Sequence, residues 1–144
     1  MNFKKVSLAE YCPSVTYQFQ VSNLRDTHLV ETLIISFHGS YRYGSAGRSD
    51  AGLIKGIIKT GITVFDPFAV LIDFSDLEYT WGDNLDLSFE ETDSTPTAIL
   101  VSDKCRRAMS TLEFGLDTPK DIVDNELFFD NYEKALEKLQ NRAL

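Results

Sequence analysis

The chain has 144 residues, which is the length of one domain, and its apolar (43%) and charged (25%) fractions are those of an ordinary globular protein. It has no run of about 18 apolar residues and no apolar stretch after its first lysines, so we predict neither a membrane span nor a secretory signal. Cys12 and Cys105 lie too far apart in the sequence for a metal or redox motif, so we expect a reduced, cytoplasmic protein without metal or cofactor.

The net charge of −8 comes from one region of the sequence. Residues 60–103 contain ten acidic side chains and no lysine or arginine, whereas the other 100 residues contain twelve acids and fourteen bases. Nucleic acid and anionic membranes are bound through basic side chains, so this region disfavours both as partners. It would attract a basic protein. The alternative is a solvated acidic face that only aids solubility.

The first half of the chain begins with strands. Residues 1–14 are predicted to be irregular. Val15–Val21 alternates apolar and polar residues, which is typical of a half-buried strand, and Leu29–Phe37 is apolar and β-branched. We expect these two strands to form a hairpin.

A glycine-rich segment, Gly39–Gly52, leads into a predicted helix over Asp50–Thr60. Ser49 or Asp50 would cap its first turn, because a short side-chain oxygen there accepts a free backbone N–H. Gly61 would end it.

The apolar run Ala69–Ile72 predicts a buried central strand, and we expect the following segment, Ser75–Asp86, to be a loop. In an α/β sheet, the loop at the carboxyl end of a central strand is a usual place for a functional site. After this loop we predict a short strand through Leu85, Leu87 and Phe89 and a further strand at Thr97–Val101. A helix capped by Ser102 or Asp103 should follow, with Cys105, Met109 and Leu112 on one face and Gly115 at its end. The last predicted elements are a strand at Glu126–Phe129 and a helix at Asn131–Arg142, with Tyr132, Ala135, Leu136 and Leu139 on one stripe.

This order predicts a single α/β domain, residues 1–144, with a mixed sheet and about three helices. The strands at residues 70–73 and 97–101 should lie side by side. We expect a monomer or a weak dimer, and the sequence leaves open whether the edge strand Val15–Val21 pairs with another copy.

Several short motifs add to this prediction. Leu71–Ser75 reads apolar-apolar-Asp-apolar-Ser after an amphipathic helix, Ile99–Ser102 precedes a helix, and Phe128–Leu136 closes the chain. Together these motifs resemble the STAS domain, the module shared by anti-sigma-factor antagonists and sulfate transporters, over about residues 30–140. The resemblance implies a STAS-like sandwich. Trp81–Leu85 falls where that family has a loop with a phosphorylated serine, and here Asp83 would imitate the phosphorylated loop.

The acidic loop is the main candidate site. An aromatic anchor surrounded by carboxylates suits a basic protein, because charge speeds the encounter and the aromatic ring holds the partner. The residues predicted to bind the partner are Asp76, Glu78, Trp81, Asp83, Asp86, Glu90 and Glu91. The alternative for Trp81 is a ring that packs onto the sheet.

A second candidate site is an anion site in the glycine-rich segment. Arg42, Ser45 and Arg48 would bind a phosphate or carboxylate there, aided by the N-terminus of the following helix. A plain connection without a ligand is the alternative. His28 and His38 have no ligand-like spacing to other residues, and we expect both to be ordinary strand or turn histidines.

Three functions are compatible with these features. We expect a non-catalytic domain that binds and neutralises a basic protein, such as an immunity protein that inhibits a bacterial nuclease toxin. The second is a STAS-type regulator that binds an anti-sigma-like kinase. The third is a small ligand-binding or enzymatic domain that uses the Gly39–Gly52 segment.

Overall fold

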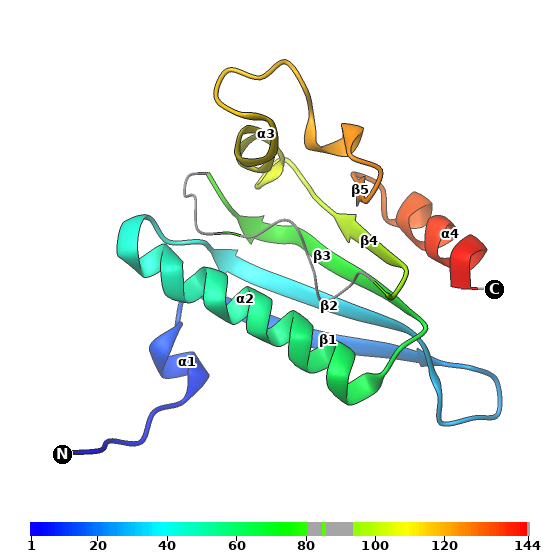
Figure 1. Cartoon of the computed structure of the whole chain (residues 1–144), viewed down its shortest axis with the longest axis horizontal. Helices are drawn as coiled ribbons and strands as arrows, with labels where there is room; N and C mark the ends of the chain where they lie inside the picture. The colour runs from blue at the N-terminus through cyan, green and yellow to red at the C-terminus, as the bar shows by residue number, and fades with distance from the viewer. Residues whose placement is uncertain (81–84, 86–93, 144) are drawn as a thin grey trace.

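The protein is built on one five-stranded mixed sheet with helices on both of its faces (Figure 1). The computed structural model describes residues 1–80, 85 and 94–143. The elements in chain order are α1 (Leu8–Tyr11), β1 (Val15–Asn23), β2 (Val30–Ser40), α2 (Gly44–Phe65), β3 (Ala69–Glu78), β4 (Thr97–Leu100), α3 (Arg106–Phe114), the 3-10 turn η2 (Ile122–Asp124), β5 (Phe128–Phe129) and α4 (Tyr132–Ala143).

The strands lie in the order β1-β2-β3-β4-β5, with β1 antiparallel to β2 and the other neighbours parallel. This confirms the predicted hairpin and the predicted pairing of residues 70–73 with 97–100. The predicted α/β fold with a mixed sheet is confirmed. The described residues form four α-helices rather than about three, because α1 lies in the segment expected to be irregular.

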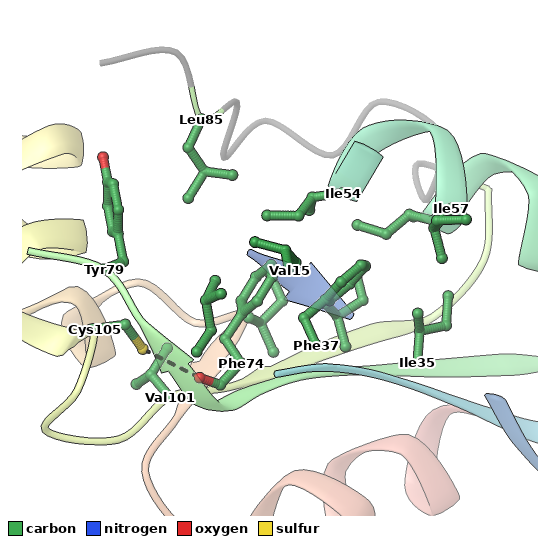
Figure 2. Packing of buried hydrophobic residues seen from close by; sticks show 14 of the residues in the cluster. Val15, Ile35, Phe37, Ile54, Ile57, Phe74, Tyr79, Leu85, Val101 and Cys105 are labelled. Carbon is green, nitrogen blue, oxygen red and sulfur yellow. Dashed lines mark hydrogen bonds between the residues drawn. The ribbon is translucent and has the colours of Figure 1, made fainter. Parts of the chain in front are cut away.

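Two apolar clusters lie on opposite faces of the sheet, since successive side chains of a strand point to opposite sides. The face under α2 and α3, here called the α2 face, carries Leu33, Ile35 and Phe37 of β2 and Val70, Ile72 and Phe74 of β3. Figure 2 shows part of this cluster, in which the rings of Phe37 and Phe74 stack with their centroids 5.5 Å apart. The opposite face, called the α4 face, buries Ala69, Leu71, Ala98 and Leu100 against Ala135 and Leu139 of α4.

Helix α2 is longer at both ends than the predicted Asp50–Thr60. It begins at Gly44, after Tyr43, and the Asp50 side chain does not cap it but lies buried and accepts hydrogen bonds from Arg42 and Ser14. Gly61 does not end it either. A Cβ at Gly61 would lie 2.7 Å from the Phe19 ring, so this glycine allows helix and sheet to approach closely.

The C-terminal elements differ less from their predictions. Helix α3 begins at Arg106, after the predicted cap residues Ser102 and Asp103, and ends before Gly115 as predicted. The predicted stripe of α4 is right for Ala135 and Leu139, which are buried, but Tyr132 is 46% exposed. The predicted strand through Leu85, Leu87 and Phe89 lies outside the described residues except for Leu85, which is buried with the α2-face cluster (Figure 2).

Candidate functional site

Near the carboxyl end of β3, successive side chains do not strictly alternate between the two faces of the sheet. This irregularity positions the acidic side chains of the strand. Ser36 of β2 lies opposite Asp73 of β3, but His38 lies opposite Asp76, so β3 has one more residue than β2 between these two pairs. This is a β-bulge, an extra residue that locally disrupts the ladder. As a result, Asp76 lies beside His38 across the strand pair.

Neighbouring side chains support the bulge. The Ser75 N–H donates to Asp73 Oδ1 at 2.8 Å, and Ser102 Oγ–H donates to the Ser75 carbonyl oxygen at 2.7 Å. The backbone groups of Ser75 therefore have partners even though the regular ladder is interrupted. The bulge also explains why Phe74 and Leu77, three residues apart, are both buried in the α2-face cluster.

Asp76 is the centre of a cluster of three polar side chains. Its Oδ2 lies 2.8 Å from His38 Nδ1, and its Oδ1 accepts a hydrogen bond of 2.7 Å from Lys104 Nζ. The hydrogen bond from Lys104, and after it that from His38, lowers the pKa of Asp76, and Asp76 in turn raises the pKa of Lys104. The Asp76 and Lys104 side chains are each 55% exposed, so a partner can reach both.

Lys104 belongs to the turn between β4 and α3. Its carbonyl oxygen accepts a hydrogen bond of 3.0 Å from the Tyr79 N–H, which holds this turn beside the end of β3. The carboxyl ends of the two strands therefore form one continuous edge, which we call the acidic edge and define by Asp73, Asp76, Glu78 and Asp103.

The described acidic residues of the 60–103 region gather mostly at this edge. Asp76, Glu78 and Asp103 are exposed, and Asp73 is half-buried. Asp66 is the exception within the described ranges: it follows α2 in the left-handed conformation, at the opposite end of β3. Of the five acids of this region that the structure describes, four therefore lie close together in space.

Two of the seven residues predicted to bind a partner are described. Asp76 and Glu78 lie in β3, so the prediction that a loop begins at Ser75 is wrong, and the strand continues to Glu78. Trp81, Asp83, Asp86, Glu90 and Glu91 lie outside the described residues.

The predicted anion site has a different geometry from the one expected. The Arg42 guanidinium donates to Asp50 at 2.9 Å, and the pKa of Arg42 is raised chiefly by this hydrogen bond. An anion would have to compete with a fully buried carboxylate for this side chain. Ser45 and Arg48 are exposed in the first turns of α2. The helix N-terminus lies at Gly44 and not at Asp50, so the predicted helix start is wrong, while the anion site itself stays a prediction.

A cleft of about 720 Å³ adjoins the acidic edge, between the end of β3 and α3. Apolar side chains line much of it, including Tyr79, Leu112 and Leu116. Its lining also includes the charged residues Asp103, Lys104 and Arg107. Leu116 is 86% exposed. The cleft could receive an apolar side chain of a bound protein.

Sequence reasoning missed the His38–Asp76–Lys104 cluster and the cleft. The signal for the cluster would have been the parallel register of β2 and β3, which brings together residues 38 positions apart. In the described part of the chain, no group of three metal-ligating side chains gathers at a metal-binding distance. None of the helices within the described ranges has the length and hydropathy needed to span a bilayer.

Comparison of the chain with models of known protein families and with curated proteins gave no match.

Proposed function

We propose that this chain is a non-catalytic protein-binding domain whose acidic edge binds a basic partner protein. The observation that carries the proposal is the distribution of charge: residues 60–103 hold ten acids and no lysine or arginine, and four of the five described acids lie along one edge. A surface with an excess of one charge attracts its opposite and speeds association, and the acids of this edge outnumber Lys104, which pairs with Asp76 there. In the sequence, five further acids follow Thr80 before Ser94.

The cleft beside the edge supports the same function. Binding energy at protein interfaces comes mostly from a few apolar or aromatic anchors in desolvated pockets, while charges at the rim set the association rate. Tyr79 and Leu112 line an apolar cleft directly next to exposed carboxylates. A basic protein with one protruding apolar side chain would fit both features.

A nuclease toxin is the partner class we propose. The active site of a nuclease is basic because it binds phosphates, and an acidic inhibitor can cover it by presenting carboxylates in their place. The domain would then act as an immunity protein. Co-expression with a nuclease encoded beside its gene should restore growth, and a lack of protection would count against this partner class.

The binding proposal is tested by charge reversal. Immobilised domain should capture a basic protein from a lysate of its source cell, and the association rate should fall steeply as salt is raised. The variant Glu78→Lys/Asp103→Lys should slow association about tenfold or more. The matched control, Glu133→Lys/Glu137→Lys on α4, changes net charge equally at exposed positions away from the acidic edge. Equal effects of the two variants would refute a specific role for the edge.

A STAS-type regulator is the second candidate, and the order of elements favours it. Helix α2 precedes the strand with Leu71–Ser75, β4 precedes α3, and β5 precedes α4, as the resemblance implies. Such a regulator would bind an anti-sigma-like kinase, with Asp83 in place of the phosphorylated serine. Titration with a kinase encoded nearby tests this candidate. Absence of binding, or binding unaffected by Asp83→Ala, would remove it.

A further inference from the structure

Strand β1 is a long edge strand without charge. It covers Val15–Asn23 and, within the described part of the chain, pairs only with β2. No Asp, Glu, Lys, Arg or His occurs between Glu10 and Arg25, although 25% of the residues of the chain are charged. Natural edge strands usually carry a charge, a proline or a bulge that prevents pairing with another chain. The register shift in β1 lies at its last pair, so the rest of the strand is regular.

The other edge of the sheet is protected. Strand β5 has two residues, Phe128 and Phe129, and the charged residue Asp130 follows it. The Asp130 carboxylate accepts a hydrogen bond of 2.9 Å from Arg106. The two edges therefore differ in length and charge, and of the two edge strands that the structure describes, β1 is the one with a long regular set of backbone groups to offer to another strand.

We propose that β1 pairs antiparallel with β1 of a second copy of the chain, about a twofold axis that passes through Phe19. In this register Phe19 faces its own copy, Gln18 faces Gln20, Tyr17 faces Val21 and Thr16 faces Ser22. A twofold interface must be self-complementary, and this register sets glutamine against glutamine, threonine against serine and tyrosine against valine, in a strand that has no charge to repel its copy. This inference does not rest on the proposed function.

The side chains match in chemistry on both sides of the joined sheet. Tyr17 and Val21, on the α2 face, are 39% and 45% exposed, and an aromatic–β-branched pair would shield both. The Tyr17 ring contacts Phe19 edge-on at 5.9 Å, and Phe19 packs on Phe65 of α2 at 5.3 Å. On the other side of the strand, the pair of Gln18 with Gln20 can form hydrogen bonds.

Pairing would create a continuous sheet from the five strands of each copy. Because the twofold axis reverses the strand direction, the acidic edges of the two copies would point to opposite ends of this sheet. The acidic edges would not repel each other at close range, and each would remain open to a partner.

Mass measurement by light scattering over a range of concentrations tests the proposal. The wild-type chain should pass from 16.3 kDa to twice that mass as its concentration rises. The double variant Gln18→Lys/Gln20→Lys places like charges opposite each other and should raise the dimer dissociation constant more than tenfold. The double variant Gln18→Lys/Gln20→Glu places opposite charges there and should remain dimeric.

Both positions are exposed, so the variants should keep the circular dichroism spectrum and melting temperature of the wild type. A wild-type mass of one chain at every concentration would overturn the proposal. So would a dimer that persists equally in the Lys/Lys variant, because its interface would then lie elsewhere. Equal loss of the dimer in both double variants would refute the register centred on Phe19.

Discussion

The two faces of the sheet are covered to different extents. The α2 face is covered by α2, α3 and η2, and its cluster includes Phe37, Phe74 and Tyr79, each at most 1% exposed. Among the described residues, the α4 face is covered by one helix, and its cluster has six buried residues, of which two are alanines on the sheet. Beyond α4, the same face carries His38 and Asp76, which are open to solvent.

An ion pair on each face shows what this difference means. The Arg42–Asp50 pair ties the start of α2 to the segment before it, with the Asp50 side chain fully buried. The Asp76–Lys104 pair has the same chemistry, but both side chains are 55% exposed. A charge without its partner is costly in a buried site and inexpensive in water. The buried pair therefore stabilises the fold, whereas the exposed pair adds little stability and is open to contact with a partner.

The largest effect should come from the covered face. Phe74→Ala removes a fully buried ring that stacks on Phe37, and we expect the free energy of unfolding to fall by about 4 kcal/mol. Urea denaturation followed by circular dichroism measures it. Phe68→Ala is the control, because Phe68 is 47% exposed and its loss should cost less than about 1 kcal/mol. Similar losses in the two variants would contradict this view of the core.

The buried ion pair should come next. Arg42→Met leaves the Asp50 carboxylate buried without its charged partner, and we expect a loss of about 3 kcal/mol. Adding Asp50→Asn should restore part of the stability, since the unpaired charge is then removed. Urea titration of the single and double variants forms a thermodynamic cycle. Strictly additive losses would show that the two side chains do not stabilise each other.

On the α4 face the loss should be smaller. Leu139→Ala removes a side chain that is 1% exposed but belongs to the smaller cluster, and we expect about 2.5 kcal/mol from urea titration. Tyr132→Ala, at a 46% exposed position of the same helix, is the control and should change stability little. If Leu139→Ala proved as costly as Phe74→Ala, the proposed inequality of the two faces would be wrong.

The smallest effect on stability should come from the exposed pair, where a pKa is the more sensitive measure. In Lys104→Met, the pKa of Asp76 should rise towards its ordinary value of 3.8, because Lys104 is the largest cause of its lowering. It should stay slightly lowered by His38. The Asp76–Lys104 pair stabilises the fold above the unfolded-state pKa of Asp76, and this contribution is lost as pH falls through the lower pKa of the folded state.

Carbon-13 NMR titration of the Asp76 carboxyl group measures its pKa in the wild type and in Lys104→Met. The control is Lys134→Met, which removes an exposed lysine of α4 and should leave the pKa of Asp76 unchanged. An unaltered titration in Lys104→Met would mean that the hydrogen bond does not persist in solution.

Local sequence patterns predicted which segments form strands better than they predicted where helices begin and end. Alternation in Val15–Val21 and the apolar run from Ala69 identify strands because burial acts on each side chain in turn. The start of α2 was missed because Asp50 looks like a cap, and its burial with Arg42 and Ser14 depends on packing that the local sequence does not display.

The sequence predicted where the candidate residues lie, but it did not predict which side chains they contact. The carboxyl end of the central strand was the expected place, and Asp76 and Glu78 lie there. Asp76 contacts His38 and Lys104, which are far from it in the sequence. These contacts depend on the strand register, on the bulge and on the turn after β4. None of these three features follows from a local pattern.

The bulge in β3 has a consequence for how this chain tolerates insertions and deletions. Phe74, Leu77 and Tyr79 point into the same cluster, so the strand accommodates one surplus residue without moving its neighbours to the wrong side. If Ser75 were deleted, Phe74, Leu77 and Tyr79 would fall into simple alternation, with Asp76 still opposite His38. Removing one residue from a central strand usually turns the following side chains to the wrong face of the sheet. In β3, loss of the Ser75 codon would leave each remaining side chain on its present face.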